Sequence, residues 1–280
     1  MKKNTVIEVN NVSKSFIKYT QNHQKIFGEL FGRDKGESVE VLKNISLTIK
    51  KGEKVALIGE LESGRSTLQR LIAGYLEPDS GTIKVRGKIT TIFFHRLMFD
   101  GTFPGKENVA LRGSFMGWSK EKIAKMTPEI FEFAELTDLM DRPTNTYKPG
   151  SPTRLGFTVE TVDKPEVLLY DENFAFGGPQ YFEKCVSRLE SLIEGEDTTM
   201  LMVHANAIVT QRLCTRALVL KDGSIVFDGD VEDAMRYYRR YCKDRSKMKK
   251  DVDDDLIDAM SEYNEDEAYA DSSGGGMGVF

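Results

Sequence analysis

The chain has 280 residues, of which 40% are hydrophobic and 30% are charged, and its formal net charge at pH 7 is −5. This composition is typical of globular proteins and excludes the fibrous and disordered classes. A small net charge without a contiguous basic stripe argues against a nucleic-acid partner, which requires many phosphate-neutralising side chains.

The sequence also argues against membrane insertion and structural disulfides. The N-terminus, MKKNTVIEVNNVSKSF, is basic but reaches polar residues before any long apolar run, which predicts neither a signal peptide nor a membrane span. No run of about 18 apolar residues follows, so any membrane role is expected to come through a partner. Cys185, Cys214 and Cys242 are widely spaced without a CxxC pair, which indicates a reducing compartment.

The first third of the chain predicts strands around a glycine-containing loop. Short β-branched or apolar runs predict strands at residues 6–9, 45–49, 55–58, 83–86 and 89–94. The strand at 55–58 runs into the loop and then into a helix at 66–75. The last two strands are separated by a turn at Gly87, and we expect them to form an antiparallel flank.

The rest of the chain alternates helices and strands. Residues 106–160 are rich in helical patterns and predict an inserted helical subdomain. They are followed by a strand at 167–170, a helix at 180–193, a strand at 200–203 and a hairpin at 217–226. This alternation predicts an α/β fold with a mostly parallel sheet. Residues 243–280 are basic, then acidic, then glycine-rich, and predict a tail that does not fold.

The segment GELESGRS, Gly59 to Ser66, has the G-x4-G-K-S spacing of a phosphate-binding loop, with arginine in place of lysine. Glycines at both ends would let backbone N–H groups face a phosphate, and Ser66 would offer a hydroxyl to Mg²⁺. Arg65 keeps the charge, but a planar guanidinium lacks the compact geometry of an ammonium group. The alternative interpretation is a tight strand-to-helix turn without a ligand.

An apolar strand in VLLYDENFAFGG ends in the adjacent carboxylates Asp171 and Glu172. In a phosphate-loop fold the first carboxylate holds Mg²⁺ through water or Ser66, and the second polarises the attacking water. The alternative is a solvated strand end. The position of the pair downstream of a phosphate loop favours the catalytic interpretation.

Two histidines are also candidates for this site, and the evidence is stronger for the first. His204 ends the strand LMVH, where a histidine can reach the γ-phosphate of a nucleotide and sense its loss. Its alternative interpretation is a strand-end histidine with a solvent partner. His95, in FFHRLMFDGTFPGKEN, has the ordinary interpretation of a partly buried loop residue.

The order of these motifs, with YKPGSPTRLGF between the helical insertion and the acid pair, resembles an ABC ATPase domain over about residues 5 to 240. The polysaccharide and teichoic-acid exporters are similar in further stretches: the spacer before VLKNISLTIKKGE, FPGKENVALRG, EIFEFAEL, the tyrosine that opens YKPGS, and YFEKC. The resemblance implies a phosphate-loop NTPase fold, with one ATPase domain at residues 1–242 ahead of the tail at 243–280.

The resemblance also implies roles for matching residues. Phe16 falls at the aromatic that stacks on adenine, with Tyr19 as the competing residue. His95 replaces the glutamine that links the metal to the transmembrane partner. Glu172 and His204 take the water-activating and switch positions, and the metal position falls to Asp171 together with Ser66. The phosphate-binding residues would be Gly59, Ser63, Gly64, Arg65, Ser66 and Thr67.

Residues 147–151 match the signature segment that closes over the ATP of the opposite protomer, with Lys148 and Gly150 as nucleotide-binding residues and Arg154 as the downstream arginine. The segment departs from the family pattern. Lys148 replaces a serine, and Pro149 replaces a glycine whose backbone N–H is lost. Gly178 stands where the family has an aspartate.

Two hypotheses follow from the resemblance. The first is an ATPase subunit that uses ATP and Mg²⁺, pairs with a second ATP-binding subunit and a membrane permease, and sits at the cytoplasmic face of the membrane through that permease. The second is a non-hydrolysing regulatory or interaction protein with the same fold. The acid pair and His204 favour the first, and the altered residues Arg65, Lys148, Pro149 and Gly178 favour the second.

Overall fold

The computed structural model describes residues 4–18, 36–93, 99–171, 179–203 and 207–242. Within them, an antiparallel sheet of order β2-β1-β4 contains β1 (Thr5–Lys18), β2 (Glu37–Lys50) and β4 (Ser80–Val85). A larger sheet of order β5-β6-β7-β3-β8-β9 contains β3 (Lys54–Gly59), β5 (Ile89–Ile92), β6 (Val167–Tyr170), β7 (Thr199–Val203), β8 (Arg216–Lys221) and β9 (Ser224–Asp230). Its strands are parallel except for β9, so the predicted α/β fold is confirmed.

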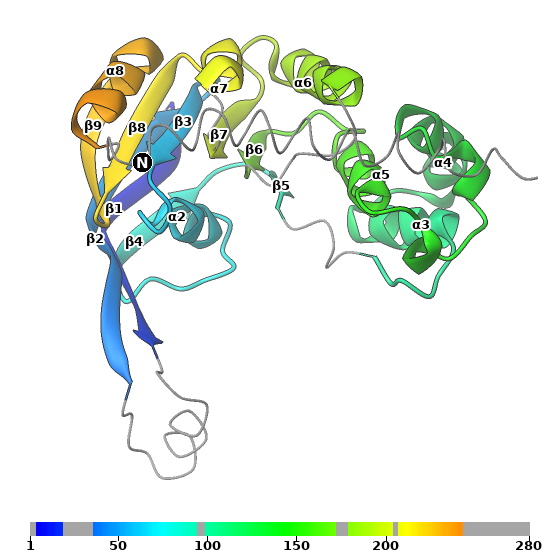
Figure 1. Cartoon of the computed structure of the whole chain (residues 1–280), viewed down its shortest axis with the longest axis horizontal. Helices are drawn as coiled ribbons and strands as arrows, with labels where there is room; N and C mark the ends of the chain where they lie inside the picture. The colour runs from blue at the N-terminus through cyan, green and yellow to red at the C-terminus, as the bar shows by residue number, and fades with distance from the viewer. Residues whose placement is uncertain (1–3, 19–35, 94–98, 172–178, 204–206, 243–280) are drawn as a thin grey trace, which may run out of the picture.

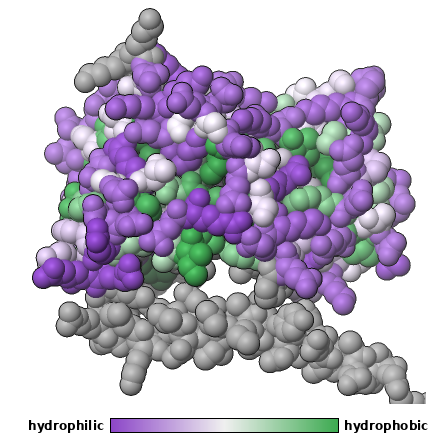
Figure 2. All heavy atoms as spheres, turned by 90° about the horizontal axis from the view of Figure 1, so that it is seen from above, coloured by the Kyte–Doolittle hydropathy of each residue, from purple (hydrophilic) through white to green (hydrophobic). Residues whose placement is uncertain are grey.

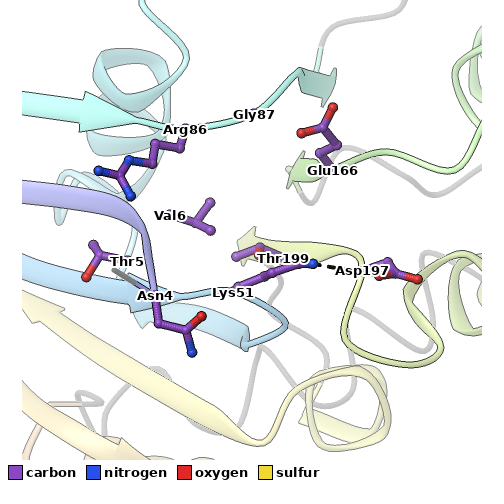
Figure 3. A pocket seen from close by; sticks show the side chains of 9 residues that line it. All are labelled: Asn4, Thr5, Val6, Lys51, Arg86, Gly87, Glu166, Asp197 and Thr199. Carbon is purple, nitrogen blue, oxygen red and sulfur yellow. Dashed lines mark ion pairs between the residues drawn. The ribbon is translucent and has the colours of Figure 1, made fainter. Parts of the chain in front are cut away.

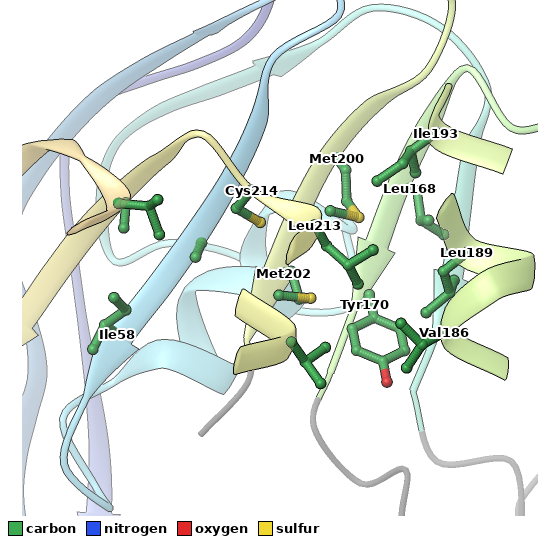
Figure 4. Packing of buried hydrophobic residues seen from close by; sticks show 14 of the residues in the cluster. Ile58, Leu168, Tyr170, Val186, Leu189, Ile193, Met200, Met202, Leu213 and Cys214 are labelled. Atoms are coloured by element: carbon green, nitrogen blue, oxygen red, sulfur yellow. The ribbon is translucent and has the colours of Figure 1, made fainter. Parts of the chain in front are cut away.

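The larger sheet is covered on both faces (Figure 1). One face packs against α6 (Pro179–Ile193), α7 (Ala207–Leu213) and α8 (Val231–Tyr241), and the other against α2 (Arg65–Ile72) and the antiparallel sheet. All residues of β6 and β7 are consequently buried, as is usual for a parallel sheet between two layers. Figure 4 shows the packing under α6 and α7, which includes Ile58, Leu168, Tyr170, Val186, Leu189, Met200, Met202 and Leu213.

The predicted antiparallel flank is correct for β4 but wrong for β5. Residues of β4 pair with β1, whereas β5 pairs in parallel with β6 in the other sheet. Gly87 has a φ of +98°, and a Cβ there would lie 2.7 Å from the Glu166 Oε2 atom. The glycine lets the chain turn closely past Glu166 from one sheet to the other.

The antiparallel ribbon of β1 and β2 is longer than the sequence predicts. The apolar pattern marks only 6–9 and 45–49, but the ladder continues to the pair Lys18 and Glu37. The added part is largely exposed and projects away from the two sheets (Figure 1). Cross-strand backbone hydrogen bonds extend the ladder there without a buried face. The sequence therefore has no alternation of apolar and polar residues that would predict this part of the strands.

The inserted segment forms a helical unit beyond β5 (Figure 1). It contains α3 (Gly105–Phe115), α4 (Lys120–Phe133) and α5 (Ser151–Glu160), with short 3-10 helices η2 (Thr137–Leu139) and η3 (Thr144–Thr146) before α5. It has an apolar cluster of its own, with Phe131 and Leu155 fully buried. Ser119 caps α4 by accepting a hydrogen bond from the Lys122 N–H.

The face seen in Figure 2 is mainly hydrophilic, with hydrophobic patches between the polar groups. Among the helices that the structure describes, none combines the length and the apolar character needed to cross a membrane. The predicted tail at 243–280 lies outside the described residues, as do the predicted site residues His95, Glu172 and His204, together with Tyr19 and Gly178.

Candidate functional site

The predicted phosphate loop connects the end of β3 to the start of α2, and its two glycines are required by their surroundings. A Cβ on Gly59 would lie 2.5 Å from the Leu220 carbonyl oxygen and 2.6 Å from the Ser63 Oγ atom. Gly64 has a φ of +102°, and a Cβ there would lie 2.6 Å from the Leu42 Cδ2 atom. No other residue fits either position without moving its neighbours.

Ser63 carries a buried hydroxyl within this loop. Its side chain is on the inner side, against Gly59, and its Oγ atom has no hydrogen-bond partner among the described residues. The backbone N–H of Ser63 donates to the Glu60 carbonyl oxygen at 3.1 Å, which fixes the loop locally. A buried hydroxyl without a partner costs free energy and calls for an explanation. A ligand with acceptor oxygens would supply the missing hydrogen bond.

The start of α2 is suited to an anion. In the described part of the chain, no side chain caps this helix and its first turn contains no acidic residue. The first backbone N–H groups of a helix have no intrahelical partner, and the helix dipole adds positive charge at the same end. Arg65, Ser66 and Thr67 lie here and are half-buried. The loop and this helix end therefore form a cradle that would suit a phosphate group.

Asp171 lies at the same edge of the sheet as the loop. Leu57 of β3 pairs with Val203 of β7, and Met202 pairs with Tyr170 of β6, so the carboxyl ends of these parallel strands meet at one edge. Asp171 directly follows Tyr170 and is buried. Ligands of open α/β sheets bind outside this edge. Glu172 follows Asp171 in the sequence, and His204 follows Val203.

Gln69 is a positioning residue that our sequence analysis did not find. It is fully buried on α2, and its Nε2 atom donates to the Tyr170 carbonyl oxygen at 2.8 Å and to the Leu201 carbonyl oxygen at 3.0 Å. These bonds tie the helix after the phosphate loop to the two strands beside it, one of which leads into Asp171. A polar residue among Leu68, Leu71 and Ile72 was the available signal.

Phe16 lies on the ribbon that passes the loop. It pairs with Val39 in the β1–β2 ladder and its side chain is partly exposed, with the Lys14 ammonium nitrogen 5.6 Å from the ring centroid. Leu42, a few residues along the same ladder, contacts Gly64. Phe16 therefore lies two residues beyond Lys14, the ladder partner of Leu42, and its exposed ring could stack on a base.

The signature segment lies at the start of α5, in the helical insertion. Tyr147 is buried, and its hydroxyl donates to the Leu139 carbonyl oxygen at 2.6 Å. Burial raises the pKa of Tyr147 to about 12, so this group stays protonated. Lys148 is exposed. Gly150 caps α5 with a φ of +83°, a conformation that favours glycine.

Backbone donors are scarce in this segment. Pro149 and Pro152 have no N–H, and the Ser151 N–H donates to the Lys148 carbonyl oxygen at 3.1 Å. Arg154, one turn further, donates to the Glu135 carboxylate at 3.2 Å and so makes contacts within its own chain. The exposed ammonium group of Lys148 is therefore the main cationic group that the segment presents.

A separate cavity of about 430 Å³ lies at the opposite edge of the sheet, where β6 and β7 begin (Figure 3). Its walls are formed by Asn4, Thr5, Val6, Lys51, Arg86, Gly87, Glu166, Asp197 and Thr199. The Lys51 and Asp197 side chains form an ion pair of 3.8 Å, but both are largely exposed, where solvent screens such pairs. The cavity contains none of the predicted site residues.

Comparisons with known proteins agree with this geometry. The family model "ABC transporter" matches residues 42–175. The chain is 32% identical to the teichoic acids export ATP-binding protein TagH of Bacillus anthracis over 90% of its own length and 46% of that protein. It is 28% identical to the protein of the same name from Staphylococcus haemolyticus, covering 87% of this chain and 92% of that one. The chain thus spans about half the length of the Bacillus relative.

Another relative and a solved structure place the chain in a family. The ABC transporter protein AbcA of Aeromonas salmonicida is 31% identical, over 84% of this chain and 76% of that protein. The dimeric ATP-binding cassette MJ0796, in a post-hydrolysis state bound to ADP and Pi, has a TM-score of 0.65 at 23% identity, over 80% of this chain and 98% of that chain. The fold, the phosphate-loop geometry and these relatives show that the chain belongs to the ABC transporter family, as an ATP-binding domain.

Proposed function

We propose that this chain is the ATP-binding subunit of an exporter of a cell-surface polysaccharide, with teichoic acid as the first candidate, and that it binds and hydrolyses Mg-ATP. The observation that carries the proposal is the phosphate-loop cradle, in which a Cβ at Gly59 or Gly64 would clash with its neighbours and the buried Ser63 hydroxyl has no partner among the described residues. The polymer is proposed from the names of the Bacillus and Staphylococcus relatives.

The residues of the site fit the groups that this chemistry requires. Oxygen donors are the ligands that Mg²⁺ prefers, and Ser66 on α2 and Asp171 after β6 offer a hydroxyl and a carboxylate. When bound, Mg²⁺ neutralises charge on the phosphate oxygens. The chain itself would bind phosphate through the loop N–H groups and Arg65, and would position the adenine ring against Phe16.

The roles of three residues outside the described ranges stay predictions. Glu172 would accept a proton from the attacking water, and His204 would contact the γ-phosphate. His95 would link the metal site to the permease. The sequence places Glu172 two residues after β6 and His204 directly after β7, and both strands end at the site edge.

We further propose two partners, a membrane permease and a second ATP-binding subunit, which would place the chain at the inner face of the membrane. A second subunit is supported by the dimeric cassettes among the structural neighbours. It is also supported by the exposure of Lys148, because an exposed cation at the start of α5 can face the nucleotide of another subunit.

A non-hydrolysing interaction protein remains the second candidate, and a specific observation favours it. The signature segment has no backbone N–H at Pro149 or Pro152, and the Ser151 N–H donates to the Lys148 carbonyl oxygen. Stabilisation of a transition state depends on donors that are already in place. A chain with few donors could bind ATP and not turn it over.

Calorimetric titration of the full chain with Mg-ATP separates these possibilities. We expect Ser63→Ala to weaken binding about tenfold or more, since a hydrogen bond to a charged group contributes ~1.5–3 kcal/mol. The melting temperature should not fall, because the lost hydroxyl has no partner in the described structure. Ser114→Ala, outside the site, is the control and should bind like the wild type.

Steady-state ATPase measurements on the wild type and Glu172→Gln complete the test. The proposal expects Glu172→Gln to bind Mg-ATP but to turn it over much more slowly. Binding without turnover in the wild type, with and without permease, would support the second candidate. If no binding is seen up to millimolar Mg-ATP in either protein, the phosphate-loop interpretation is wrong.

A further inference from the structure

The start of α5 is attached to the start of α6 by an arginine on an aromatic ring. The guanidinium carbon of Arg154, in the first turn of α5, lies 4.4 Å from the centroid of the Tyr181 ring, in the first turn of α6. Tyr181 is buried, so the contact is shielded from water on one side. A cation over a ring face is attracted by the ring quadrupole, and shielding strengthens that attraction.

The Glu135 carboxylate adds a second connection between α5 and α6. One of its carboxylate oxygens accepts from Arg154 of α5 at 3.2 Å, and the other accepts from Lys184 of α6 at 3.2 Å. The Lys184 ammonium also donates to the Phe133 carbonyl oxygen at 2.8 Å and lies 4.7 Å from the Phe133 ring centroid. A single carboxylate at the end of α4 therefore bridges cations from both helices.

A second attachment joins the other end of α5 to the same helix. The Arg188 guanidinium on α6 donates to the Thr161 carbonyl oxygen at 2.8 Å and to the Thr161 hydroxyl at 3.0 Å. Arg154 and Thr161 lie two helical turns apart, and so do Tyr181 and Arg188. The cation–π contact of Arg154 and the hydrogen bonds of Arg188 thus hold α5 to α6 at both ends. A tilt or slide of α5 along α6 would break one of these attachments.

The two helices lead directly to the predicted catalytic segments. Lys148 and Gly150 immediately precede α5, and α6 begins at Pro179, shortly after Asp171. We propose that Arg154 is a positioning residue that couples these segments within one chain. Through Tyr181 and Glu135 it would fix the start of α5, with the signature segment that precedes it, relative to the start of α6. This inference rests on the proposed ATPase function.

The chain offers a matched control for this contact. The Lys122 ammonium lies 4.8 Å from the Trp118 ring centroid and is paired with Asp163. It combines the same elements, a cation, a ring and a carboxylate, but it lies within the helical insertion, and its contacts in the described residues are with Trp118 and Asp163 and not with α6. Loss of Lys122 removes a comparable set of contacts without releasing the junction between α5 and α6.

Steady-state ATPase kinetics on the full chain test the proposal. We expect Arg154→Met to lower kcat about tenfold with less than a twofold change in KM for ATP, since misplacement of about 1 Å can cost ~100-fold in rate. Arg154→Lys should recover part of the loss. Tyr181→Phe keeps the aromatic ring under Arg154 and should therefore lower kcat much less than Arg154→Met. Lys122→Met should leave kcat unchanged.

The double variant decides whether the two residues act together. Tyr181→Leu should lower kcat like Arg154→Met, and the combination should be no worse than either single change. Additive losses, or a loss in Lys122→Met equal to that in Arg154→Met, would overturn the proposal and leave only a general effect on folding.

Amide hydrogen exchange tests the junction between α5 and α6 without any need for ATPase activity. In nucleotide-free protein, Arg154→Met should speed amide exchange in the first turns of both α5 and α6, and Lys122→Met should not. If the wild type shows no ATPase activity, the proposed function fails, and this measurement still decides on the junction. Unchanged exchange in Arg154→Met would reject the coupling whatever the activity.

Discussion

The phosphate-loop corner and the helical insertion treat buried polar groups in opposite ways. At the corner, the buried Ser63 hydroxyl has no partner in the described structure. In the insertion, the buried Asn108 side chain accepts from the Asp100 N–H at 2.8 Å and donates to the Asp100 and Phe103 carbonyl oxygens at 2.9 and 3.1 Å. Buried polar groups with complete partners stabilise a scaffold, whereas an incomplete set points to a ligand.

A buried ion pair extends the contrast. In the insertion, the Glu160 carboxylate is almost fully buried and is paired with Arg112 of α3. The pair joins the first and last helices of that unit. The corner instead presents Arg65 at the start of α2, where it is half-buried beside the loop. The insertion thus buries a carboxylate together with its cationic partner, whereas the cation at the corner is half-buried at the start of a helix.

The largest effect should come from breaking the buried pair. We expect Arg112→Met to lower the free energy of unfolding by ~3–5 kcal/mol, because it leaves a buried carboxylate without a partner. Chemical denaturation measures this. Lys106, also on α3, forms an exposed ion pair with Asp141. Lys106→Met is therefore the control and should change the free energy of unfolding little. Equal losses in the two variants would contradict the distinction.

The same variant should make stability depend more strongly on pH. Burial raises the pKa of Glu160, and the hydrogen bond from Arg112 opposes that rise. A raised folded-state pKa gives stability that is fully present below the unfolded pKa and is lost as pH rises through the folded pKa. Without Arg112 the pKa should rise further. The loss in free energy of unfolding caused by Arg112→Met should therefore be larger at pH 8 than at pH 5. An equal loss at the two pH values would contradict a raised pKa of Glu160.

The next largest effect should come from filling the cradle. Gly64→Ala places a Cβ 2.6 Å from Leu42 at a φ of +102°, and should cost ~2–4 kcal/mol from strain and overpacking. It should also abolish Mg-ATP binding. Gly117 has a φ of +82° with nothing within 4 Å of an added Cβ, so Gly117→Ala carries the backbone strain alone. ATP binding that survives in Gly64→Ala would show that phosphate binds elsewhere.

Removing the side chain behind the cradle should have an intermediate effect. Gln69→Met has a similar volume but leaves the carbonyl oxygens of Tyr170 and Leu201 without their buried donor. Leaving such groups unpaired costs ~1–3 kcal/mol. We expect a lower melting temperature and a lower kcat, with Gln211→Met, an exposed glutamine on α7, as the neutral control. An unchanged melting temperature and kcat in Gln69→Met would mean that α2 is positioned by apolar packing alone.

Sequence reasoning succeeded where one local pattern fixes one local structure. The spacing from Gly59 to Ser66 and the apolar strand before Asp171 were enough to place the loop and the carboxylate after strands of a parallel sheet. It failed where the outcome depends on distant partners. The strand at 89–92 could pair with β4, the strand before it, or with β6, the strand after it, and only tertiary packing selects β6.

Side-chain partners were equally out of reach. The sequence places Arg154 beside the signature segment, but not against Tyr181, which lies far along the chain. Nothing in the spacing distinguishes an arginine that contacts nucleotide from one that contacts a neighbouring helix. The family pattern marks Arg154 only as the arginine downstream of the signature segment, whereas its contacts assign it to the scaffold.

The smallest effect concerns the one charged residue that departs from the family pattern inside the cradle. Arg65 has the charge of the usual lysine, but its guanidinium is wider and planar. It can bind phosphate oxygens in a shifted position, so ATP affinity can survive. The geometry needed for hydrolysis is stricter.

We therefore expect Arg65→Lys to raise kcat by up to about tenfold, ~1.4 kcal/mol in activation free energy, and to change ATP affinity less. The gain should grow when Lys148→Ser and Pro149→Gly restore donors at the start of α5, because the two segments would then act on the same transition state. Turnover at saturating Mg-ATP across the single, double and triple variants measures this. If activity falls when Arg65 becomes lysine, the guanidinium is itself the working phosphate ligand, and the cradle is adapted to it.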